Sequence, residues 1–486
     1  MPLTFDLAAS ARQEMLNQGF NPDFPPTANA ELNAIAAKAL PAPSVGLQDL
    51  RSLAWSSIDN DDSKDLDQIE AAERTDAGIR VRIGIADVDW AVTLGTALDQ
   101  HAQSQTTTVY SGVTVFPMLP ERLSTDLTSL NDEQDRVAVI IEFTVSPNDG
   151  SVGAHAVYPA LVRNKAQLMY SEVGPWLEGT GPVPAKIAGH DDLIDQLKMQ
   201  DEASKLLLDA RHRLGALDFD RVETESVTVN GHVEIRARRK NRAGELIEDF
   251  MVAANSVMAR TLGDAGVSSI RRVVKAPERW PRIVELAQQH GTKLPDQPDA
   301  GALNQFLQAR KAADPAHYAD VSLAVLKLMG PGEYVLLKAG EASEGHFGLA
   351  AHDYTHSTAP NRRFADVVTQ RILKAVQAKA AAPYNDDALQ AIAQNCTLKE
   401  DAARKVERNM QKRIAAVALS SHIGQQFKAV VTGVVPHKGV FVRIIDPPAE
   451  GRLMRGEQGL DVGDQIVVRL LAADRARGFI DFARVG

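Results

Sequence analysis

Five aspartates lie close together in residues 58–70, which read IDNDDSKDLDQIE; they are Asp59, Asp61, Asp62, Asp65 and Asp67. Carboxylates at such short separation repel one another, and the apolar sequence beside them makes the ionised forms costly. A hard divalent cation with oxygen ligands would relieve this repulsion. The segment therefore predicts a metal site, and the simplest alternative is a solvated acidic turn.

Two kinds of metal site fit this segment. Counted from Asp59, acidic or hydroxyl side chains fall at positions 1, 3, 5, 7 and 9, with Glu70 at position 12, which is the register of an EF-hand calcium loop. Against this, Lys64 stands where the loop needs Gly, and residues 80–88 (RVRIGIADV) read as a strand instead of a helix. The other site is catalytic: carboxylates hold one or two Mg²⁺ ions against a phosphate.

The rest of the chain resembles the catalytic RNB domain of the ribonuclease II family. The spacing Asp59-x5-Asp65-x-Asp67 is similar to the acidic loop of that family. Four more blocks follow in the order of the family: Tyr110 with Phe116–Pro120, Asn164–Leu168, Glu248–Asn255, and His346–Leu349 with Tyr354 and Thr358–Asp366. Five ordered blocks over roughly residues 48–420 are hard to obtain by chance, although each block alone would be weak.

The resemblance implies a processive, Mg²⁺-dependent 3′→5′ exoribonuclease that hydrolyses single-stranded RNA to nucleoside 5′-monophosphates. It implies that Asp59 and Asp65 hold Mg²⁺, and that Asp67 lies at the terminal sugar hydroxyl or at a second metal ion. Arg362, at the start of an expected helix, would stabilise the oxyanions of the transition state, because its fork of donors suits phosphate geometry. Asp65, Asp67 and Arg362 are the expected catalytic residues.

One departure concerns the fourth carboxylate of the loop. The family pattern reads Asp-Met-Asp-Asp, whereas this chain reads Asp65-Leu66-Asp67-Gln68. Gln68 still offers a carbonyl oxygen as a metal ligand but brings no charge. A non-catalytic RNA-binding protein of the same fold, weakened in metal binding, is therefore an alternative, and a Ca²⁺-binding protein is a more distant one.

Several residues are expected to contact RNA. Tyr110 would stack near the terminal base and Glu407 would lie near the terminal nucleotide, both by resemblance. The basic runs 236–242 and 271–275, which include Arg271 and Arg272, are candidate walls of a channel that guides phosphates. In the C-terminal region His437 and Phe441 are candidate stacking platforms, because Lys438 replaces the aromatic residue usual there. Solvated turns, a half-buried tyrosine and a core phenylalanine are the corresponding structural alternatives.

The predicted architecture is α+β in three parts. Residues 1–47 form two short helices, Leu7–Asn17 and Asn29–Leu40, in a small helical or helix-turn-helix-like module that is too short for tandem cold-shock domains. Residues 48–422 form the RNB-type domain, in which helices surround a mixed sheet and a central RNA channel. Residues 424–486 contain about five short strands and resemble an OB-type RNA-binding barrel.

Composition is ordinary for a soluble globular protein. The 486 residues are 44% hydrophobic and 24% charged, and the net charge of −10 argues against a uniformly basic, duplex-coating surface. The single Cys396 excludes a disulfide framework. We expect no signal peptide and no membrane span, because no apolar run is long enough. A cytoplasmic monomer without an obligate protein partner is the expectation.

Overall fold

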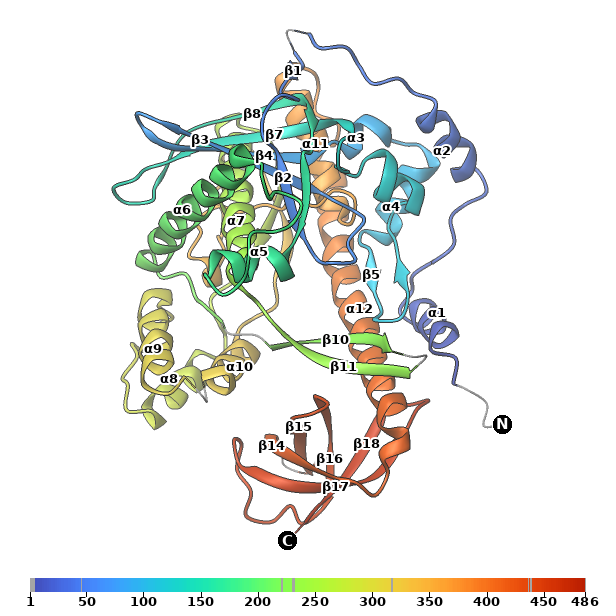
Figure 1. The fold of residues 1–486 in the computed structure, drawn as a ribbon, viewed down its shortest axis with the longest axis vertical. Coiled ribbons are helices and arrows are strands. Elements are labelled where there is room, and N and C mark those ends of the chain that lie inside the picture. Colours follow the sequence, from blue (N-terminus) through green and yellow to red (C-terminus); the bar gives the residue numbers. More distant parts are fainter. Residues whose placement is uncertain are drawn as a thin grey trace.

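The aspartate-rich segment connects two strands of a seven-stranded sheet, which lies at the centre of the larger part of the molecule (Figure 1). The computed structural model describes residues 5–44, 46–219, 222–229, 232–315, 318–435, 437 and 439–485. The strands of the large sheet are β1 (Gln48–Asp49), β2 (Ser56–Asp59), β3 (Gln68–Thr75), β4 (Gly78–Ala86), β7 (Asp135–Val145), β8 (Val152–Arg163) and β9 (Ala166–Met169). Their order is β1-β8-β7-β4-β3-β2-β9, and only the β1–β8 and β2–β9 pairs are parallel.

The helices of the body are α3 (Val88–Ala91), α4 (Ala97–Gln105), α5 (Tyr170–Leu177), α6 (Asp191–Arg213), α7 (Arg242–Asp264), α8 (Trp280–Gln289), α9 (Ala300–Ala313), α10 (Tyr318–Leu328), α11 (Phe364–Gln377) and α12 (Asp386–Leu419). The helices α6 and α7 pack on one face of this sheet, whereas α8, α9 and α10 form a separate cluster. Shorter helical turns are η1 (Leu123–Leu127), η2 (Phe347–Leu349) and η3 (Ser420–His422). Small two-stranded sheets pair β5 (Val109–Tyr110) with β6 (Val115–Phe116), β10 (Val222–Val229) with β11 (His232–Arg239), and β12 (Ser269–Val273) with β13 (Glu333–Leu337).

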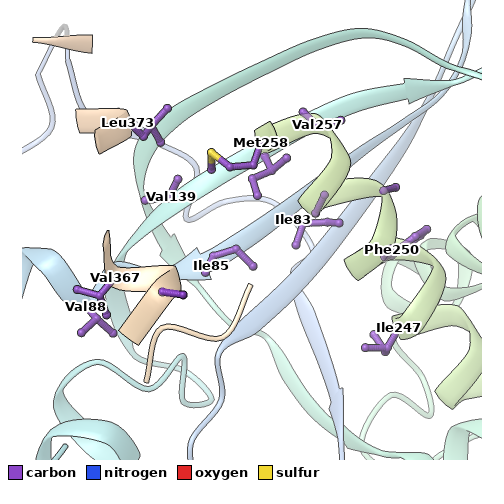
Figure 2. Close-up of a cluster of buried hydrophobic side chains, with 14 of the residues drawn as sticks. Ile83, Ile85, Val88, Val139, Ile247, Phe250, Val257, Met258, Val367 and Leu373 are labelled. Atoms are coloured by element: carbon purple, nitrogen blue, oxygen red, sulfur yellow. The ribbon is translucent and has the colours of Figure 1, made fainter. Parts of the chain in front are cut away.

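The main core lies between the sheet and the helices α7 and α11. Ile83 and Ile85, two residues apart on β4, point to the same face and meet Phe250 and Met258 of α7 and Val367 of α11 (Figure 2). All five side chains are buried. Burial of this apolar surface, at about 25 cal/mol per Å², is the main force that fixes α11, and with it the segment that precedes it, against the sheet.

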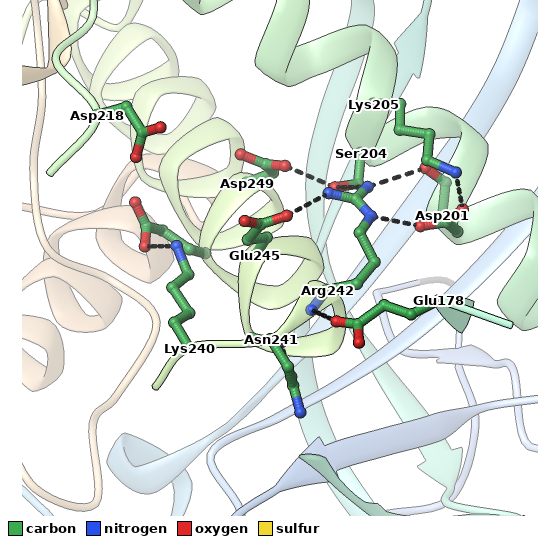
Figure 3. A network of polar contacts seen from close by, with 12 residues as sticks. Glu178, Asp201, Ser204, Lys205, Asp218, Lys240, Asn241, Arg242, Glu245 and Asp249 are labelled. Carbon is green, nitrogen blue, oxygen red and sulfur yellow. Dashed lines mark hydrogen bonds and ion pairs between the residues drawn. The ribbon is translucent and has the colours of Figure 1, made fainter. Parts of the chain in front are cut away.

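A buried polar network joins α6 to α7 beside this core (Figure 3). Arg242, at the start of α7, donates to Asp201 Oδ1 at 2.6 Å and to Ser204 Oγ at 2.8 Å. Ser204 in turn donates to Asp249 Oδ2 at 2.5 Å, and Asp249 forms an ion pair with Arg211. The network therefore satisfies polar groups that would be costly to bury unpaired, and it fixes how the two helices pack.

The two N-terminal helices pack on different parts of the body. The helix α1 (Leu7–Asn17) lies beside α12, where Glu14 forms an ion pair of 3.0 Å with Arg413 (Figure 1). The helix α2 (Ala28–Ala36) packs on α4, and its Glu31 accepts hydrogen bonds from the backbone N–H groups of Ala97 and Leu98. A helix-turn-helix needs two helices joined by a short turn. The helix-turn-helix expectation is therefore wrong, because ten residues separate these helices and each packs on a different helix of the body.

The C-terminal strands form a closed barrel. They are β14 (Gln426–Val435), β15 (Gly439–Ile444), β16 (Ala449–Arg455), β17 (Gln465–Asp474) and β18 (Phe479–Arg484), in the order β14-β15-β16-β18-β17. The last turns of α12 contribute Ile414, Ala415 and Leu419 to the barrel core. In Figure 1 the β10–β11 hairpin lies between the barrel and the rest of the body, beside α12. The α+β architecture predicted from the sequence, with N-terminal helices and a five-stranded barrel, is confirmed.

No helix in the part of the chain that the structure describes is both long enough and apolar enough to span a bilayer.

Candidate active site

The acidic loop runs from residue 60 to residue 67, between β2 and β3, and Leu66 is its one apolar residue. Leu66 is fully buried, its N–H donates to Ser129 Oγ at 2.9 Å, and its carbonyl accepts from the N–H of Leu130 at 3.0 Å. Because Leu66 is anchored in this way, its neighbours Asp65 and Asp67 are fixed on either side of it. The flanks of the loop are the strands β2 and β3, not helices, so the EF-hand interpretation is wrong.

Asp67 is the most enclosed carboxylate of the loop. It is 2% exposed, its Oδ1 accepts the backbone N–H of Asn361 at 2.9 Å, and its Oδ2 lies 3.4 Å from Nε of Arg362. Burial raises the pKa of Asp67 to about 7, although the Arg362 guanidinium opposes this shift. The structure therefore brings together two of the three residues expected to be catalytic.

Arg362 stands on a tightly bonded turn just before α11. Asp366 Oδ1 accepts the N–H of Ala359 at 2.7 Å, and Thr128 donates to Asn361 Oδ1 at 2.6 Å. The carbonyl of Arg362 accepts the N–H of Thr108 at 3.0 Å. The backbone is thus fixed on both sides, whereas the Arg362 side chain is 45% exposed. Its remaining donors are available to an anion.

Tyr110 links the acidic loop to α12. Its hydroxyl donates to Asp65 Oδ2 at 3.1 Å, and its backbone N–H lies 3.4 Å from Oε1 of Glu407. Tyr110 is 42% exposed as a residue, and burial raises the pKa of the half-buried Glu407. Tyr110 and Glu407, predicted from quite different parts of the sequence, therefore lie together at the site.

Asp59 and Gln68 face each other at the two ends of the loop. The Gln68 amide donates to Asp59 Oδ1 at 3.3 Å. Burial, reinforced by the nearby Asp65, raises the pKa of Asp59 to about 7. Gln68 thus gives Asp59 a hydrogen bond where a second carboxylate would repel it.

The oxygen atoms of this cluster suit a divalent cation. Asp59 Oδ2 and Asp67 Oδ2 are buried and accept no hydrogen bond. Within the described ranges no three His, Cys, Asp or Glu side chains are gathered closely enough to hold a metal ion alone. Mg²⁺ is commonly bound by one or two carboxylates, with water and substrate phosphates completing the octahedron. The residues present therefore fit Mg²⁺ in the expected way, with Asp59, Asp65, Asp67 and Gln68 as the available donors.

Arg271 and Arg272 do not line a surface. Arg271 is 1% exposed and donates to Asp353 at 2.6 Å, and Arg272 is 6% exposed and donates to both oxygens of Glu400 at 2.5 and 3.0 Å. The prediction that these two residues contact RNA is wrong, because their guanidinium groups are buried in internal ion pairs. In the other basic run, the side chains of Arg236, Arg238 and Arg239 lie outside the described residues.

The barrel residues point away from its core. Phe441 is half-buried on β15 between the inward-facing Val440 and Val442, so it lies on the outer surface and not in the core. His437 is exposed in the connection between β14 and β15, with φ of 64°. Lys438 lies outside the described residues. Both described side chains are therefore accessible to a base, and a role in RNA binding stays a prediction.

Glu70 has no predicted role beyond its place in the calcium register. It is fully buried on β3, two residues beyond Gln68, and neither of its side-chain oxygens has a hydrogen-bond partner. Burial and the nearby Asp59 raise its pKa well above the usual value. The alternation of side chains along a strand places Gln68 and Glu70 on one face, and this was the signal available in the sequence.

Comparison with known proteins agrees with these findings. The RNB domain model matches residues 47–379, and the model for the RNase II-type exonuclease C-terminal S1 domain matches residues 425–485. Ribonuclease R of Thermotoga maritima is 30% identical over 95% of this chain and 68% of its own, and Ribonuclease R 1 of Lactococcus lactis is 29% identical over 95% and 59%. This chain therefore spans only part of the length of these curated relatives.

A solved structure has the same fold. Mycoplasma genitalium RNase R, in complex with ribose methylated single-stranded RNA, aligns with a TM-score of 0.87 at 23% identity, over 99% of this chain and 78% of that one. The RNB model alone covers more than half of the present sequence. This chain belongs to the RNB-domain family of exoribonucleases, the ribonuclease R and ribonuclease II family, and carries the C-terminal S1 domain of that type.

Proposed function

We propose that this protein is a processive, Mg²⁺-dependent 3′→5′ exoribonuclease that hydrolyses single-stranded RNA to nucleoside 5′-monophosphates. The observation that carries the proposal is the position of Asp67, buried between Arg362 and the N–H of Asn361 and next to Asp65. An acidic cluster that faces an exposed guanidinium suits a phosphodiester, because one side binds a cation and the other binds phosphate oxygens. Support for RNA as substrate comes from the family and from the RNA in the related structure.

Each residue of the site has a proposed part in the reaction. Asp59 and Asp65, with the carbonyl oxygen of Gln68 as a neutral ligand, would hold Mg²⁺. The ion would lower the pKa of a bound water and neutralise charge on the phosphate. Asp67 accepts a hydrogen bond from the terminal sugar and orients it, since its position is fixed by the Asn361 N–H. Arg362 donates to the phosphate oxygens as negative charge builds on them.

Three further features would position the RNA. Tyr110 offers its exposed ring to the terminal base, while its hydrogen bond to Asp65 fixes the ring orientation. Glu407 lies beside the Tyr110 backbone and would contact the terminal nucleotide. His437 and Phe441 of the barrel would stack on bases upstream in the strand, which would reach the site through a channel in the RNB-type domain.

The protein would act in the cytoplasm as a monomer without an obligate protein partner. The buried thiol of Cys396, the single cysteine of the chain, supports a reducing compartment.

The direct test uses single-stranded RNA labelled uniformly along its length, with the 3′ end free or blocked, and Mg²⁺. We expect mononucleotides from the free 3′ end and none from the blocked RNA. Asp67→Asn should abolish release while leaving RNA binding intact, because the amide keeps the volume and the Asn361 contact. Asp62→Asn, on an exposed residue of the same loop, is the matched control and should behave like the parent.

The second candidate is a non-catalytic RNA-binding protein of this fold. The uncharged Gln68, bonded to Asp59, favours it because the loop has one carboxylate fewer than the family pattern. Retained RNA binding without mononucleotide release, for the parent protein as well as for Asp67→Asn, would establish this alternative and reject the exonuclease.

A further inference from the structure

The site lacks one negative charge at position 68, and a carboxylate of no assigned role lies nearby. Glu70 follows Gln68 by two residues on β3, so both side chains leave the strand on the same face, roughly 7 Å apart along it. The glutamate side chain is one methylene longer than aspartate, which extends its reach back along the strand. The sequence therefore places a carboxylate two residues away from position 68, where the family pattern has one.

The neighbouring strand brings Glu70 close to the cation ligands. Ser56 on β2 is the direct partner of Glu70 on β3, and β2 ends at Asp59. Opposite residues in an antiparallel pair share a face of the sheet. Gln68, which shares a face of β3 with Glu70, donates to Asp59 Oδ1 at 3.3 Å, so Asp59 lies at the end of the row that contains Glu70. Glu70 thus lies behind the acidic loop and not on a separate surface.

A group of buried oxygen atoms around Glu70 has no hydrogen-bond partner. These are Glu70 Oε1 and Oε2, Ser56 Oγ, Asp59 Oδ2 and Gln200 Oε1. Gln200, on α6, is itself fully buried and its amide nitrogen donates to the Glu70 carbonyl at 3.4 Å. Buried polar atoms in folded proteins nearly always have partners. Oxygen donors gathered in this way, from three different elements, are what a hard divalent cation requires.

No basic side chain compensates the charge of an ionised Glu70. Among the described residues no Lys or Arg side chain forms an ion pair with it. Its neighbours on the same face, Ile58 and Ala72, are fully or almost fully buried and apolar. Burial of an unpaired carboxylate lowers the stability of the fold by several kcal/mol, and an apolar residue at this position would avoid that loss. The carboxylate is therefore a group whose presence a bound cation would explain.

We propose that Glu70 supplies the charge that Gln68 lacks, as a carboxylate ligand that binds the divalent cation together with Asp59. This inference rests on the proposed metal-dependent function and adds a residue to its metal site. Ser56 and Gln200 provide neutral oxygen atoms behind the two carboxylates. Glu70 would thus supply, two residues further along β3, the negative charge that the family pattern has at position 68.

The test measures Mn²⁺ binding to the full-length protein without RNA, by electron paramagnetic resonance and calorimetry. Glu70→Gln, which has the same shape, should weaken Mn²⁺ binding at least tenfold and remove most of the rise in melting temperature that Mn²⁺ produces. Asp62→Asn, in the same loop, should change the affinity by less than twofold. Circular dichroism and the metal-free melting temperature check that each variant is folded.

A second set of variants tests whether the two positions share one role. Gln68→Asp should restore Mn²⁺ affinity to the Glu70→Gln protein, and should improve it more in that background than in the parent. This comparison holds even where the single Glu70→Gln variant is less stable, because the double variant restores the charge. Equal effects of Gln68→Asp in both backgrounds would overturn the proposal.

The possible failures are distinct. If Glu70→Gln binds Mn²⁺ like the parent while Asp59→Asn does not, the inference about Glu70 is rejected and the metal site of the proposed function stands. If the parent itself binds no Mn²⁺, both are rejected.

Discussion

The hydroxyl of Tyr110 donates a hydrogen bond of 3.1 Å to Oδ2 of Asp65, which joins the β5–β6 hairpin to an acidic loop 45 residues earlier in the chain. Two substitutions distinguish the contribution of the aromatic ring from that of the hydroxyl hydrogen bond. Tyr110→Phe keeps the aromatic surface, so we expect a rate on single-stranded RNA within about threefold of the parent. Tyr110→Ala removes a stacking surface worth about 1–3 kcal/mol per base, so KM for short oligonucleotides should rise strongly.

The two Tyr110 variants are compared by their KM for short oligonucleotides and by the length of the shortest product on a gel. Equal KM values for the Phe and Ala variants would show that Tyr110 does not stack on RNA.

Arg362 is expected to act mainly on the rate and only weakly on binding. Its guanidinium lies 3.4 Å from Asp67 and is half exposed, where it can reach phosphate oxygens. Loss of one preorganised donor to a transition state costs about 10²–10³-fold in rate. We expect Arg362→Ala to show this loss in single-turnover kinetics, with the RNA dissociation constant changed far less.

Arg362→Lys is the matched control, because it keeps the charge and loses the fork of donors. Its rate should lie between those of the parent and the Ala variant. A full rate for either variant would remove Arg362 from the mechanism.

Gln68 is expected to limit the affinity for Mg²⁺. A carboxylate at this position would add charge to the donor set, so Gln68→Asp should lower the Mg²⁺ concentration that gives half the maximal rate. Gln68→Asn, equally short but neutral, separates charge from size and should not lower it. Mg²⁺ titrations of initial rate measure both, and an unchanged requirement in the Asp variant would mean that position 68 does not touch the ion.

Asp249 should make stability depend on pH. Burial raises its pKa to about 6 from the usual 3.8, despite the ion pair with Arg211. Because the folded state binds this proton more tightly, the contribution of Asp249 is fully present below pH 4 and is lost as the pH rises through 6. Relative to Asp249→Asn, the free energy of unfolding of the parent should fall by up to about 3 kcal/mol between pH 4 and pH 7.

Urea unfolding of both proteins at several pH values gives this difference. A difference that stays constant with pH would show that Asp249 titrates normally in the folded state.

Arg272 should matter for stability and not for RNA binding. Its two hydrogen bonds to Glu400 tie β12 to α12 in the interior, and its guanidinium lies over the ring of Tyr334 at 4.7 Å. Removing one partner of a buried ion pair costs about 3–5 kcal/mol, which Arg272→Ala should show in chemical unfolding. Lys275→Ala, on an exposed side chain, should cost less than about 0.5 kcal/mol.

Neither the Arg272 nor the Lys275 variant should change RNA affinity when folded. Loss of RNA binding by a folded Arg272→Ala protein would restore this residue to the RNA-binding surface.

The sequence could predict side chains that lie close together in one short segment, and helices whose apolar pattern extends over several turns. Asp59, Asp65 and Asp67 belong to one short loop, and the apolar periodicity of residues 245–262 fixes the position of α7. The order of the sequence blocks shared with the family then predicted that Arg362 belongs to the same site, although it lies nearly 300 residues away. Asp67 contacts Arg362 in the structure.

The errors have a common physical cause, which is that a partner distant in sequence decides the environment. Arg271 and Arg272 look like a basic patch until Asp353 and Glu400 are brought against them. In the same way Glu70 looks like one more residue of an acidic segment. Only the pairing of β3 with β2, and the packing of Gln200 on it, shows that its carboxylate is enclosed.

The helix α12 carries Glu407 at the active site and ends inside the barrel core at Leu419, without a break. At 1.5 Å per residue these two points are roughly 18 Å apart on one rigid rod. Under the proposed function, an RNA strand that contacts both ends of this helix would span a constant length. A strand shorter than that length would lose contact with the barrel while its last nucleotide still reached Tyr110, so the length of α12 would set the shortest RNA that binds at both places.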